Sequence, residues 1–351
     1  MGSSQSRAAA TEAQACWGAR DRADETEQDG PAGPSDVVVI GSCNTDLVVF
    51  APRLPKEGET LTGTEFKVLF GGKGANQAVM AARLGAKTSM VGKVGRDSFG
   101  RDTLQNFKEF GVNVRHVTKT IPGEPQSTGT ASICVGGGEN HIVITPGANG
   151  CISESDVLDA KDVFEGAKVI LAQLETSVDR TLQAFRLAKA AEKPALCVLT
   201  PAPAVPLPDE AFELTDLMCP NQSETELLTG LPCGSEEEAA EAAKSLMAKG
   251  CKRVVISMGS RGALVCGPDG AALVECPKVE KEKVVDTTGA GDALVGSLAR
   301  ILAAKPEIEL AAAVEAACAV ASLTVQVQGA QASYPSFTDP QVKEILQRVG
   351  I

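Results

Sequence analysis

The sequence contains few histidines and few aromatic residues. It has two histidines, one tryptophan and one tyrosine among 351 residues, and aromatic residues make up 3% of the chain. Because His116 and His141 are the only imidazoles, a carboxylate is the better candidate for any catalytic base. The chain is 43% hydrophobic, so alanine, valine and leucine must fill its core in place of aromatic rings.

Basic charge, long apolar runs and clustered cysteines are also missing. The formal net charge is −12, which argues against a nucleic-acid partner because such partners select a basic surface. No apolar run reaches the ~18 residues of a membrane span, so we expect no transmembrane segment. The 11 cysteines show neither Cys-x-x-Cys nor zinc-ligand spacing. They indicate small buried side chains in a reducing compartment.

The first 35 residues differ in composition from the rest. Residues 1–35 are rich in Ala, Ser, Gln, Gly and charge, which predicts a disordered N-terminal extension. The opening Met1-Gly2-Ser3-Ser4-Gln5-Ser6 fits the N-myristoylation pattern, and Cys16 is the nearby candidate for a second acyl chain. One myristoyl chain binds membranes weakly. A weak lipid anchor at Gly2 and a plain disordered extension are therefore the two alternatives.

From residue 36 onward, apolar strand-like segments alternate with helical patterns. This alternation predicts an α/β domain over 36–346, with a doubly wound, mostly parallel sheet flanked by helices. Two segments, near 47–70 and 126–146, break the alternation and have the pattern of antiparallel strands with turns. The expected strands are 36–40, 169–174, 195–199, 217–219, 254–258 and 263–266, and the expected helices are 75–84, 179–191, 224–228 and 236–249.

A glycine-rich turn near the C-terminus carries an aspartate. Gly289-Ala290-Gly291-Asp292 precedes an apolar, helix-competent segment over 293–304. A helix beginning there directs free backbone N–H groups toward its N-terminal side, which attracts anions. A carboxylate beside an anion site fits a group that accepts a proton from an attacking hydroxyl. The alternative is an ordinary helix start with an acidic residue in its first turn.

A second glycine loop lies at residues 70–78. Phe70-Gly71-Gly72-Lys73-Gly74-Ala75-Asn76 precedes a helical pattern, but it lacks the spacing of a P-loop. The segment 41–44 also lacks the later glycines of a dinucleotide fingerprint. Alone, the second loop predicts no more than a tight turn. The combination of Asn76 in this loop with Asp292 in the C-terminal glycine-rich turn is more informative than either loop alone.

Together the two loops resemble the signature motifs of the ribokinase-like (phosphofructokinase-B) carbohydrate kinases. The resemblance covers about residues 36–334, and the loop at 71–76 is most similar to the ribokinase branch of the family. It implies a small β-sheet lid over the sugar, which in this family often mediates dimerisation, so we expect a homodimer. Further matching segments occur in the same order at 41–46, 93–100, 173–175 and 329–331, with Ser333.

The resemblance implies ATP-dependent phosphorylation of D-ribose at the O5 hydroxyl, giving D-ribose 5-phosphate. Asp292 would be the general base, and the backbone N–H groups of Gly289, Ala290 and Gly291 would form an anion hole. One alternative is a kinase for deoxyribose, fructose or a nucleoside. A single Trp and a single Tyr, however, leave few aromatic rings on which a nucleobase could stack. Another is a non-catalytic sugar or nucleotide sensor, which the intact loop around Asp292 disfavours.

Sugar hydroxyls both donate and accept hydrogen bonds, so carboxylates and amides bind them well. Taken alone, Asp46 could form a turn and Glu175 could start a helix. The resemblance instead places both in the sugar pocket. The implied sugar-binding residues are Asn44, Thr45, Asp46, Gly71, Gly72, Lys73, Gly74, Asn76, Glu175 and Asp292.

The resemblance also implies a nucleotide site. Thr200 stands where the family usually has an asparagine, and its side chain is shorter and lacks the amide. This difference bears on nucleotide affinity and leaves the reaction class unchanged. The implied nucleotide-binding residues are Asn221, Ser257, Met258, Gly259, Ser260, Arg261, Gly262, Gly291, Asp292 and Cys318.

Two cations are implied as cofactors. Asn221 and Glu224 would organise Mg²⁺ through water, although the same pair could be a helix N-cap. K⁺ or a similar monovalent cation would be held mainly by backbone carbonyls and by Asp286, which could alternatively cap its own turn. The expected partners are thus D-ribose and ATP. The expected location is the cytoplasm, with nuclear localisation or weak membrane association as alternatives if Gly2 is myristoylated. The implied K⁺ positions are Asp286, Thr288, Thr324, Val327, Gly329 and Ser333.

Overall fold

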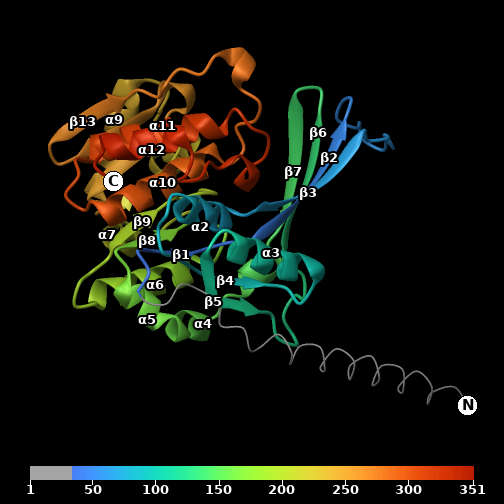
Figure 1. Ribbon diagram of the computed structural model, residues 1–351, viewed down its shortest axis with the longest axis horizontal. Helices are drawn as coiled ribbons and strands as arrows, with labels where there is room; N and C mark the ends of the chain where they lie inside the picture. The colour runs from blue at the N-terminus through green and yellow to red at the C-terminus, as the bar shows by residue number, and fades with distance from the viewer. Residues whose placement is uncertain (1–33) are drawn as a thin grey trace, which may run out of the picture.

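A nine-stranded sheet runs through the molecule in the order β13-β12-β11-β10-β9-β8-β1-β4-β5 (Figure 1). The structure is a computed structural model and describes residues 34–351, so Gly2 and Cys16 lie outside it. Neighbouring strands pair in parallel from β5 to β11, and the pairs β11–β12 and β12–β13 are antiparallel. The strands are β1 (Val37–Ile40), β4 (Thr88–Val94), β5 (Val112–Lys119), β8 (Val169–Ala172), β9 (Leu196–Leu199), β10 (Leu217–Met218), β11 (Arg253–Ser257), β12 (Ala263–Gly267) and β13 (Gly270–Val274).

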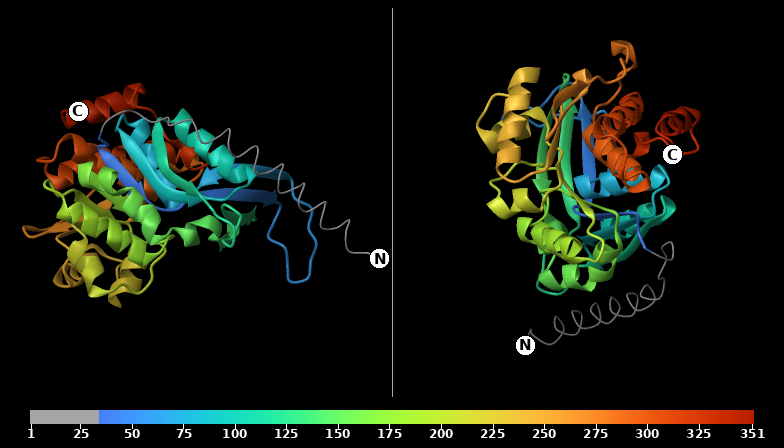
Figure 2. Two further views of the ribbon diagram at one scale, coloured as in Figure 1. Left: turned by 90° about the horizontal axis from the view of Figure 1, so that it is seen from below. Right: turned by 90° about the vertical axis from the view of Figure 1, so that its left-hand side faces the viewer.

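Helices cover both faces of this sheet (Figure 2). The central strand β1 shows why its sequence is a continuous β-branched run. Val37 and Val39 belong to the core on one face, whereas Val38 and Ile40 belong to the core on the other. A strand buried on both faces needs apolar residues at every position. The predicted α/β fold with a mostly parallel sheet is therefore confirmed.

The two cores separate the helices into two layers. Five helices contribute to the first core: α2 (Lys73–Arg83), α3 (Ser98–Glu109), α10 (Ala290–Ala304), α11 (Leu310–Thr324) and α12 (Pro340–Arg348). Six contribute to the second: α4 (Glu154–Asp159), α5 (Lys161–Gly166), α6 (Val178–Ala190), α7 (Asp209–Leu214), α8 (Gln222–Thr229) and α9 (Glu236–Ala248). Within residues 34–351, no helix is both long and apolar enough to cross a membrane.

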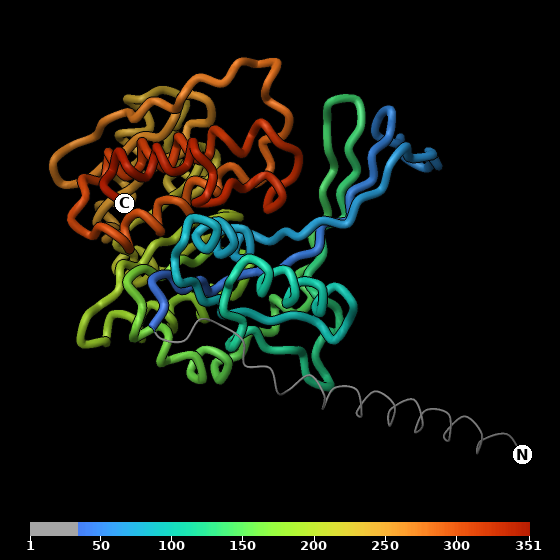
Figure 3. The backbone as a smooth tube through the Cα atoms, in the orientation of Figure 1, coloured from blue at the N-terminus to red at the C-terminus, as the bar shows by residue number. Residues whose placement is uncertain are grey.

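A separate four-stranded sheet projects from the main body (Figures 1 and 3). Its order is β3-β2-β6-β7, with β2 (Asn44–Ala51), β3 (Glu65–Gly71), β6 (Gly129–Gly136) and β7 (Glu139–Thr145). The hairpins β2–β3 and β6–β7 are antiparallel, as expected, but β2 and β6 pair in parallel. An alternating pattern indicates strands without specifying which strands pair, so the sequence did not predict this central parallel pair.

Several elements begin elsewhere than the sequence patterns indicated. Helix α10 starts at Ala290, three residues before the expected 293, because Gly289 adopts a left-handed φ of 76° at the N-cap. Asp292 therefore lies inside the first turn of the helix. Periodicity did not identify β4, β5 or α3, whose segments mix polar side chains into the buried positions.

Helices α2 and α10 make a close contact at Gly296. A Cβ at this position would lie 2.7 Å from Met80 Cβ and 2.8 Å from the carbonyl oxygen of Gln77. Both distances are shorter than ordinary van der Waals contact, so only glycine allows this separation of the two helices. The N-terminal turn of α2 is thereby placed beside the first turn of α10.

We predict that Gly296→Ala lowers the free energy of unfolding by a net amount of up to ~2 kcal/mol. Overpacking a rigid contact typically costs ~1–3 kcal/mol, which exceeds the ~1 kcal/mol that alanine gains over glycine within a helix. Urea unfolding measures the change. Gly150→Ala is the matched control, because its Cβ would lie 3.8 Å from the nearest Pro146 atom. Equal stabilities of the two variants would contradict the prediction.

Candidate active site

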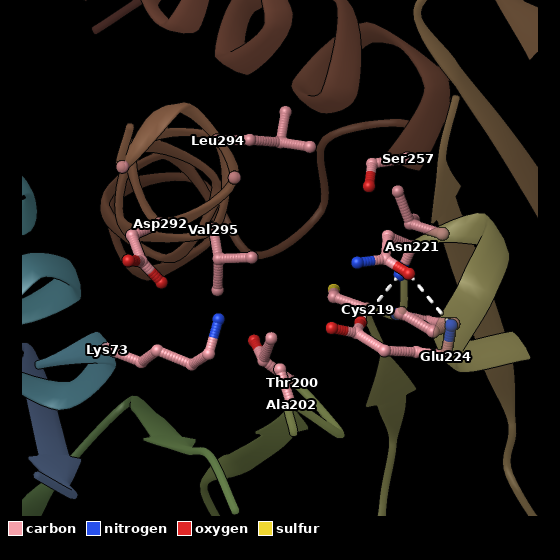
Figure 4. Close-up of a pocket in the computed structure, with 14 residues that line it drawn as sticks. Lys73, Thr200, Ala202, Cys219, Asn221, Glu224, Ser257, Asp292, Leu294 and Val295 are labelled. Carbon is pink, nitrogen blue, oxygen red and sulfur yellow. Dashed lines mark hydrogen bonds between the residues drawn. The ribbon is translucent and has the colours of Figure 1, made fainter. Parts of the chain in front are cut away.

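Polar side chains from several strand ends converge on the first turn of α10, where they line a cavity of about 230 Å³ (Figure 4). In open α/β sheets, ligands bind beyond the carboxyl ends of the strands. Thr200 directly follows β9, and Asn221 lies three residues beyond β10. Asp292 faces the same cavity from α10, and Lys73 enters it from α2.

Asp292 is a buried carboxylate held by two amides of α2. Asn76 Nδ2 donates to its Oδ2 at 2.9 Å, and Gln77 Nε2 donates to its Oδ1 at 3.0 Å. Burial raises the pKa of Asp292, while Lys73 and these two hydrogen bonds act in the opposite direction. The net pKa is above that of an exposed aspartate, which makes Asp292 a stronger base near neutral pH.

The backbone of the glycine-rich turn lies beside Asp292. Gly289 and Gly291 line the cavity of Figure 4. The N–H of Ala290 donates to the carbonyl of Thr287 at 3.2 Å, so this predicted anion-hole donor is engaged within its own turn. Tyr334 Oη donates to the Gly289 carbonyl at 3.0 Å, which fixes the turn against the C-terminal segment. The start of α10 is therefore a rigid anion-attracting terminus.

Most of the predicted sugar residues gather on the lid side of Asp292. Glu175 Oε2 accepts hydrogen bonds from Ser42 Oγ and from the backbone N–H of Lys73, the latter at 2.9 Å. Asn149 Nδ2 donates to Asn44 Oδ1 at 2.7 Å, which orients the Asn44 amide. These side chains are fixed acceptors and amides of the kind that bind hydroxyl groups.

Asp46 approaches the glycine loop closely. A Cβ at Gly71 would lie 2.4 Å from Asp46 Oδ2, so glycine at 71 makes room for this carboxylate. Burial and the nearby charges of Glu175 and Asp292 raise the pKa of Asp46 to about 6. Three carboxylates therefore lie near one another, and the charges of Glu175 and Asp292 disfavour ionisation of Asp46.

Three of the predicted sugar residues are placed differently. Thr45 lies on the opposite face of β2 from Asp46, because successive strand residues alternate in direction. Gly74 packs against the turn after β1, where a Cβ would lie 2.6 Å from the backbone nitrogen of Ser42. The Lys73 ammonium points into the cavity that Asn221 and Glu224 line (Figure 4). Its backbone N–H, in contrast, donates to Glu175.

Asn221 and Glu224 form the capping box of α8. Asn221 Oδ1 accepts the Glu224 N–H at 2.8 Å, and Glu224 Oε2 accepts the Asn221 N–H at 2.8 Å. The helix-cap alternative is thus present, and both side chains also line the cavity of Figure 4. A carboxylate and an amide oxygen suit Mg²⁺ that keeps most of its waters, so the donor set fits the implied ion.

Asp286 joins two of the other implied K⁺ positions, Thr288 and Gly329. Its Oδ1 accepts the Thr288 N–H and its Oδ2 accepts the Gly329 N–H, both at 2.9 Å. Burial acts to raise the pKa of Asp286, but hydrogen bonds from Thr288 and Gly329 outweigh it, so the pKa is lowered. Asp286 therefore caps its turn and also joins two loops. An ionised carboxylate is a suitable ligand for a monovalent cation.

A second cavity, of about 620 Å³, adjoins the first and shares Ser257, Gly291 and Leu294 with it. Of the predicted nucleotide residues, Ser257, Gly259, Ser260, Gly262, Gly291 and Cys318 line this cavity. Asn221 and Asp292 line the smaller one, and Met258 and Arg261 line neither of these two cavities. The sequence did not reveal the apolar wall, which includes Cys276, Pro277, Val279, Val284, Leu294, Ala321 and Val325.

Buried amides are the functional side chains that sequence reasoning missed. Gln77 contacts both Asp292 and Thr200, and Gln173 Nε2 donates to Gln77 Oε1 at 2.6 Å. Gln331 Nε2 donates to Asn76 Oδ1 at 3.0 Å. Gln173 and Gln331 lie in segments that carried the family resemblance, and this was the one signal in the sequence that could have identified them. A glutamine in a sequence does not reveal whether it is buried.

We predict that Asp46→Asn stabilises the protein at about pH 8 more than at about pH 5. The folded-state pKa of Asp46, about 6, lies above its ordinary value of 3.8. The stability contributed by protonated Asp46 is present below pH 3.8 and is lost as the pH rises through 6. Asparagine cannot ionise, so the variant avoids this loss. Urea unfolding at both pH values measures the difference, and a pH-independent difference would contradict the assigned pKa.

Three comparisons bear on the ancestry of this chain. A ribokinase of Mus musculus is 43% identical over 305 residues, covering 86% of this chain and 93% of the relative. A deoxyribokinase of Salmonella typhi is 38% identical, covering 86% and 96%. A solved Arabidopsis thaliana ribokinase, complexed with ribose and ATP, has a TM-score of 0.80 at 30% identity and covers 90% of this chain and 99% of its own.

The profile of the family described as "pfkB family carbohydrate kinase" matches residues 34–336, almost the entire region that the structure describes. The matched range contains both glycine loops, the lid and every strand of the central sheet. This chain therefore belongs to the pfkB family of carbohydrate kinases.

Proposed function

We propose that this protein transfers the γ-phosphoryl group of ATP to the O5 hydroxyl of D-ribose, giving D-ribose 5-phosphate and ADP. One observation carries the proposal: Asp292 lies in the first turn of α10 near the carboxylates of Asp46 and Glu175, and it lines a cavity that adjoins a second cavity of about 620 Å³. The relatives named ribokinase, at 43% and 37% identity, support ribose as the substrate. The kinase domain is assigned to residues 36–346, with the lid near 47–70 and 126–146.

In the proposed reaction, Asn44, Asp46, Asn76 and Glu175 bind the sugar hydroxyls and direct O5 toward Asp292. Asp292 accepts the O5 proton as O5 attacks the γ-phosphorus. The new O5–P bond forms while the bond between the γ-phosphorus and its bridging oxygen breaks, and ADP leaves. This transfer depends mainly on positioning and charge neutralisation.

The chain supplies two sources of positive potential for the transferring phosphoryl group. Gly289 and Gly291 present the backbone at the N-terminus of α10, and Lys73 places its ammonium in the same cavity. Preorganised donors of this kind typically account for ~10²–10³ in rate. Bound with ATP, Mg²⁺ supplies further charge neutralisation, and Asn221 and Glu224 would hold its waters. The adenine ring would occupy the apolar cavity beside Cys318.

A monovalent cation such as K⁺ fits the proposal as a structural cofactor. The Asp286 carboxylate already joins the Thr288 turn to the loop at Gly329. A cation held there would tighten the turn that leads into Gly289 and Asp292. We therefore expect K⁺ to raise turnover by ordering the anion site, with ligands drawn from the carbonyls of Thr288, Thr324, Val327, Gly329 and Ser333.

Deoxyribose is the main alternative substrate, because a relative named deoxyribokinase is 38% identical to this chain. Fructose, a nucleoside and binding without turnover are further alternatives. The higher identity to the Mus musculus ribokinase favours ribose. Cytoplasmic localisation stays a prediction, as do nuclear localisation and a lipid anchor at Gly2, which falls outside the described residues.

We predict that Asp292→Asn lowers kcat by about 10²–10⁴, the usual scale for a general base, while sugar and ATP binding change little. The variant keeps an oxygen for Asn76 or Gln77 to contact but cannot accept the proton. ADP release, measured with ribose, ATP and Mg²⁺, gives kcat, and calorimetry gives the two affinities. Turnover close to wild type would rule out Asp292 as the base.

The same assay tests the substrate and the cation. Ribose, deoxyribose, fructose and adenosine are compared with and without K⁺. We expect the highest kcat/KM with ribose and stimulation by K⁺. Turnover only with another sugar would assign that sugar as the substrate in place of ribose. Saturable ribose binding without turnover would favour a sensor and would make Thr200 the next residue to test.

The lid also supports the proposal of a homodimer. On the face of the lid opposite Asp46, Val49 pairs with Phe66 and Leu47 pairs with Val68. Phe66 is 60% exposed and Val143, on the same face, is 68% exposed. An apolar sheet face of this kind is typically covered by another surface. A second copy of the lid offers the same apolar face in return, which suits a two-fold interface.

We predict that Phe66→Lys converts a dimer to a monomer, because the interface would have to bury a charge without a partner. Sedimentation equilibrium at micromolar concentration measures the mass. Leu158→Lys, at a residue of α4 that is 48% exposed, is the matched control and should leave the dimer intact. A monomeric wild type, or a dimeric Phe66→Lys variant, would exclude this interface.

A further inference from the structure

A line of amide side chains reaches from Asp292 to helix α3. Asn76 Nδ2 donates to Asp292 Oδ2 at 2.9 Å, and Gln331 Nε2 donates to Asn76 Oδ1 at 3.0 Å. Asn106 Nδ2 then donates to Gln331 Oε1 at 2.8 Å. Three elements that are distant in the sequence are thus joined to the proposed base by hydrogen bonds that all run in one direction.

The direction of these bonds is fixed by the chemistry of the amide group. An amide has a donor end and an acceptor end. Because Gln331 donates to the Asn76 oxygen, the Asn76 nitrogen must face Asp292. A flipped Asn76 would set its oxygen against a carboxylate oxygen and its nitrogen against the Gln331 nitrogen. Asn106 prevents Gln331 from flipping in the same way.

Burial makes such a flip costly. Asn76, Asn106 and Gln331 are 6%, 7% and 4% exposed, so bulk water has little access to replace a lost partner. An unpaired polar group in such a position costs more than the hydrogen bond itself contributes. The hydrogen bonds from Asn106 to Gln331 and from Gln331 to Asn76 therefore support the orientation of the Asn76 amide toward Asp292.

We propose that Gln331 and Asn106 are positioning residues, which act through Asn76 to keep a hydrogen-bond donor directed at Asp292. This inference rests on the proposed role of Asp292 as the general base. The donated N–H favours the ionised carboxylate and holds its plane, so that the base is charged and correctly oriented when O5 approaches. Neither Gln331 nor Asn106 needs to touch the substrate for this role.

Other groups also act on Asp292, and a test must leave them unchanged. Lys73 favours its ionised form, whereas Glu175 opposes it. The remaining charged or titratable groups that interact with Asp292 are Asp46, Glu224 and Tyr334. A substitution that introduces no charge is therefore required, which selects Gln331→Met over Gln331→Glu.

In Gln331→Met, we expect kcat to fall about tenfold or more and the KM for ATP to stay unchanged. Asn76 can then rotate, and losing its donated N–H raises the pKa of Asp292. The acidic limb of the kcat–pH profile should move upward by about one pH unit. In Asn106→Leu, Gln331 keeps its donor but loses its orienting partner, so a smaller shift in the same direction is expected.

Gln105→Met is the matched control, because Gln105 is the exposed neighbour of Asn106 on α3 and bonds to Glu109. It should keep the wild-type profile. Thermal unfolding and ribose calorimetry establish that each variant is folded. An unmoved acidic limb in both Gln331→Met and Asn106→Leu, with lower thermal stability, would show that the amides only pack the core and would overturn the proposal.

A direct titration separates this inference from the proposed function. The ¹³C signal of the Asp292 carboxyl, assigned by its loss in Asp292→Asn, gives the pKa in wild type and in Gln331→Met. A raised pKa in a protein that does not phosphorylate ribose would leave the positioning role standing and remove the substrate assignment. An unchanged pKa in a protein that does phosphorylate ribose would remove the positioning role and leave the substrate assignment standing.

Discussion

The burial of one carboxylate, that of Asp292, among hydrogen-bond donors constrains much of this structure. Asp292 is 8% exposed, and burial alone would favour its protonated form. Helix α2 offsets this effect with two amide donors, which requires α2 and α10 to approach each other at Gly296. The close contact between these helices is thus both a packing feature of the core and a condition for the chemistry.

Asp292 separates two parts of the site that differ in electrostatic character. On the lid side, Asp46 and Glu175 crowd Asp292 with like charge, which the hydroxyl groups of a sugar would relieve by donating hydrogen bonds. On the other side, Lys73 and the first turn of α10 provide positive potential for a phosphoryl group. Asp292 lies where these two environments meet, which is where the proposed reaction requires a proton to leave the acceptor hydroxyl.

The amides behind Asp292 were the part of the site that motif reasoning could not predict. Gln173 and Gln331 stand in segments that carried the resemblance, but nothing local shows that their side chains turn inward. Lys73 was expected on the sugar; its backbone N–H bonds to Glu175, and its ammonium enters the cavity that Asn221 and Glu224 line. Asn221 and Glu224 form a helix cap and still line the cavity, so the two alternatives are compatible.

The sequence by itself determined the α/β class, the two glycine loops and the identity of the proposed base. These follow from local patterns: strand and helix periodicity, glycine where the backbone must turn, and a carboxylate beside a helix start. The tertiary structure decided the parallel pairing of β2 with β6, the apolar cavity of about 620 Å³ and the amide network around Asp292. Each of these depends on contacts between residues far apart in the chain, which no local pattern encodes.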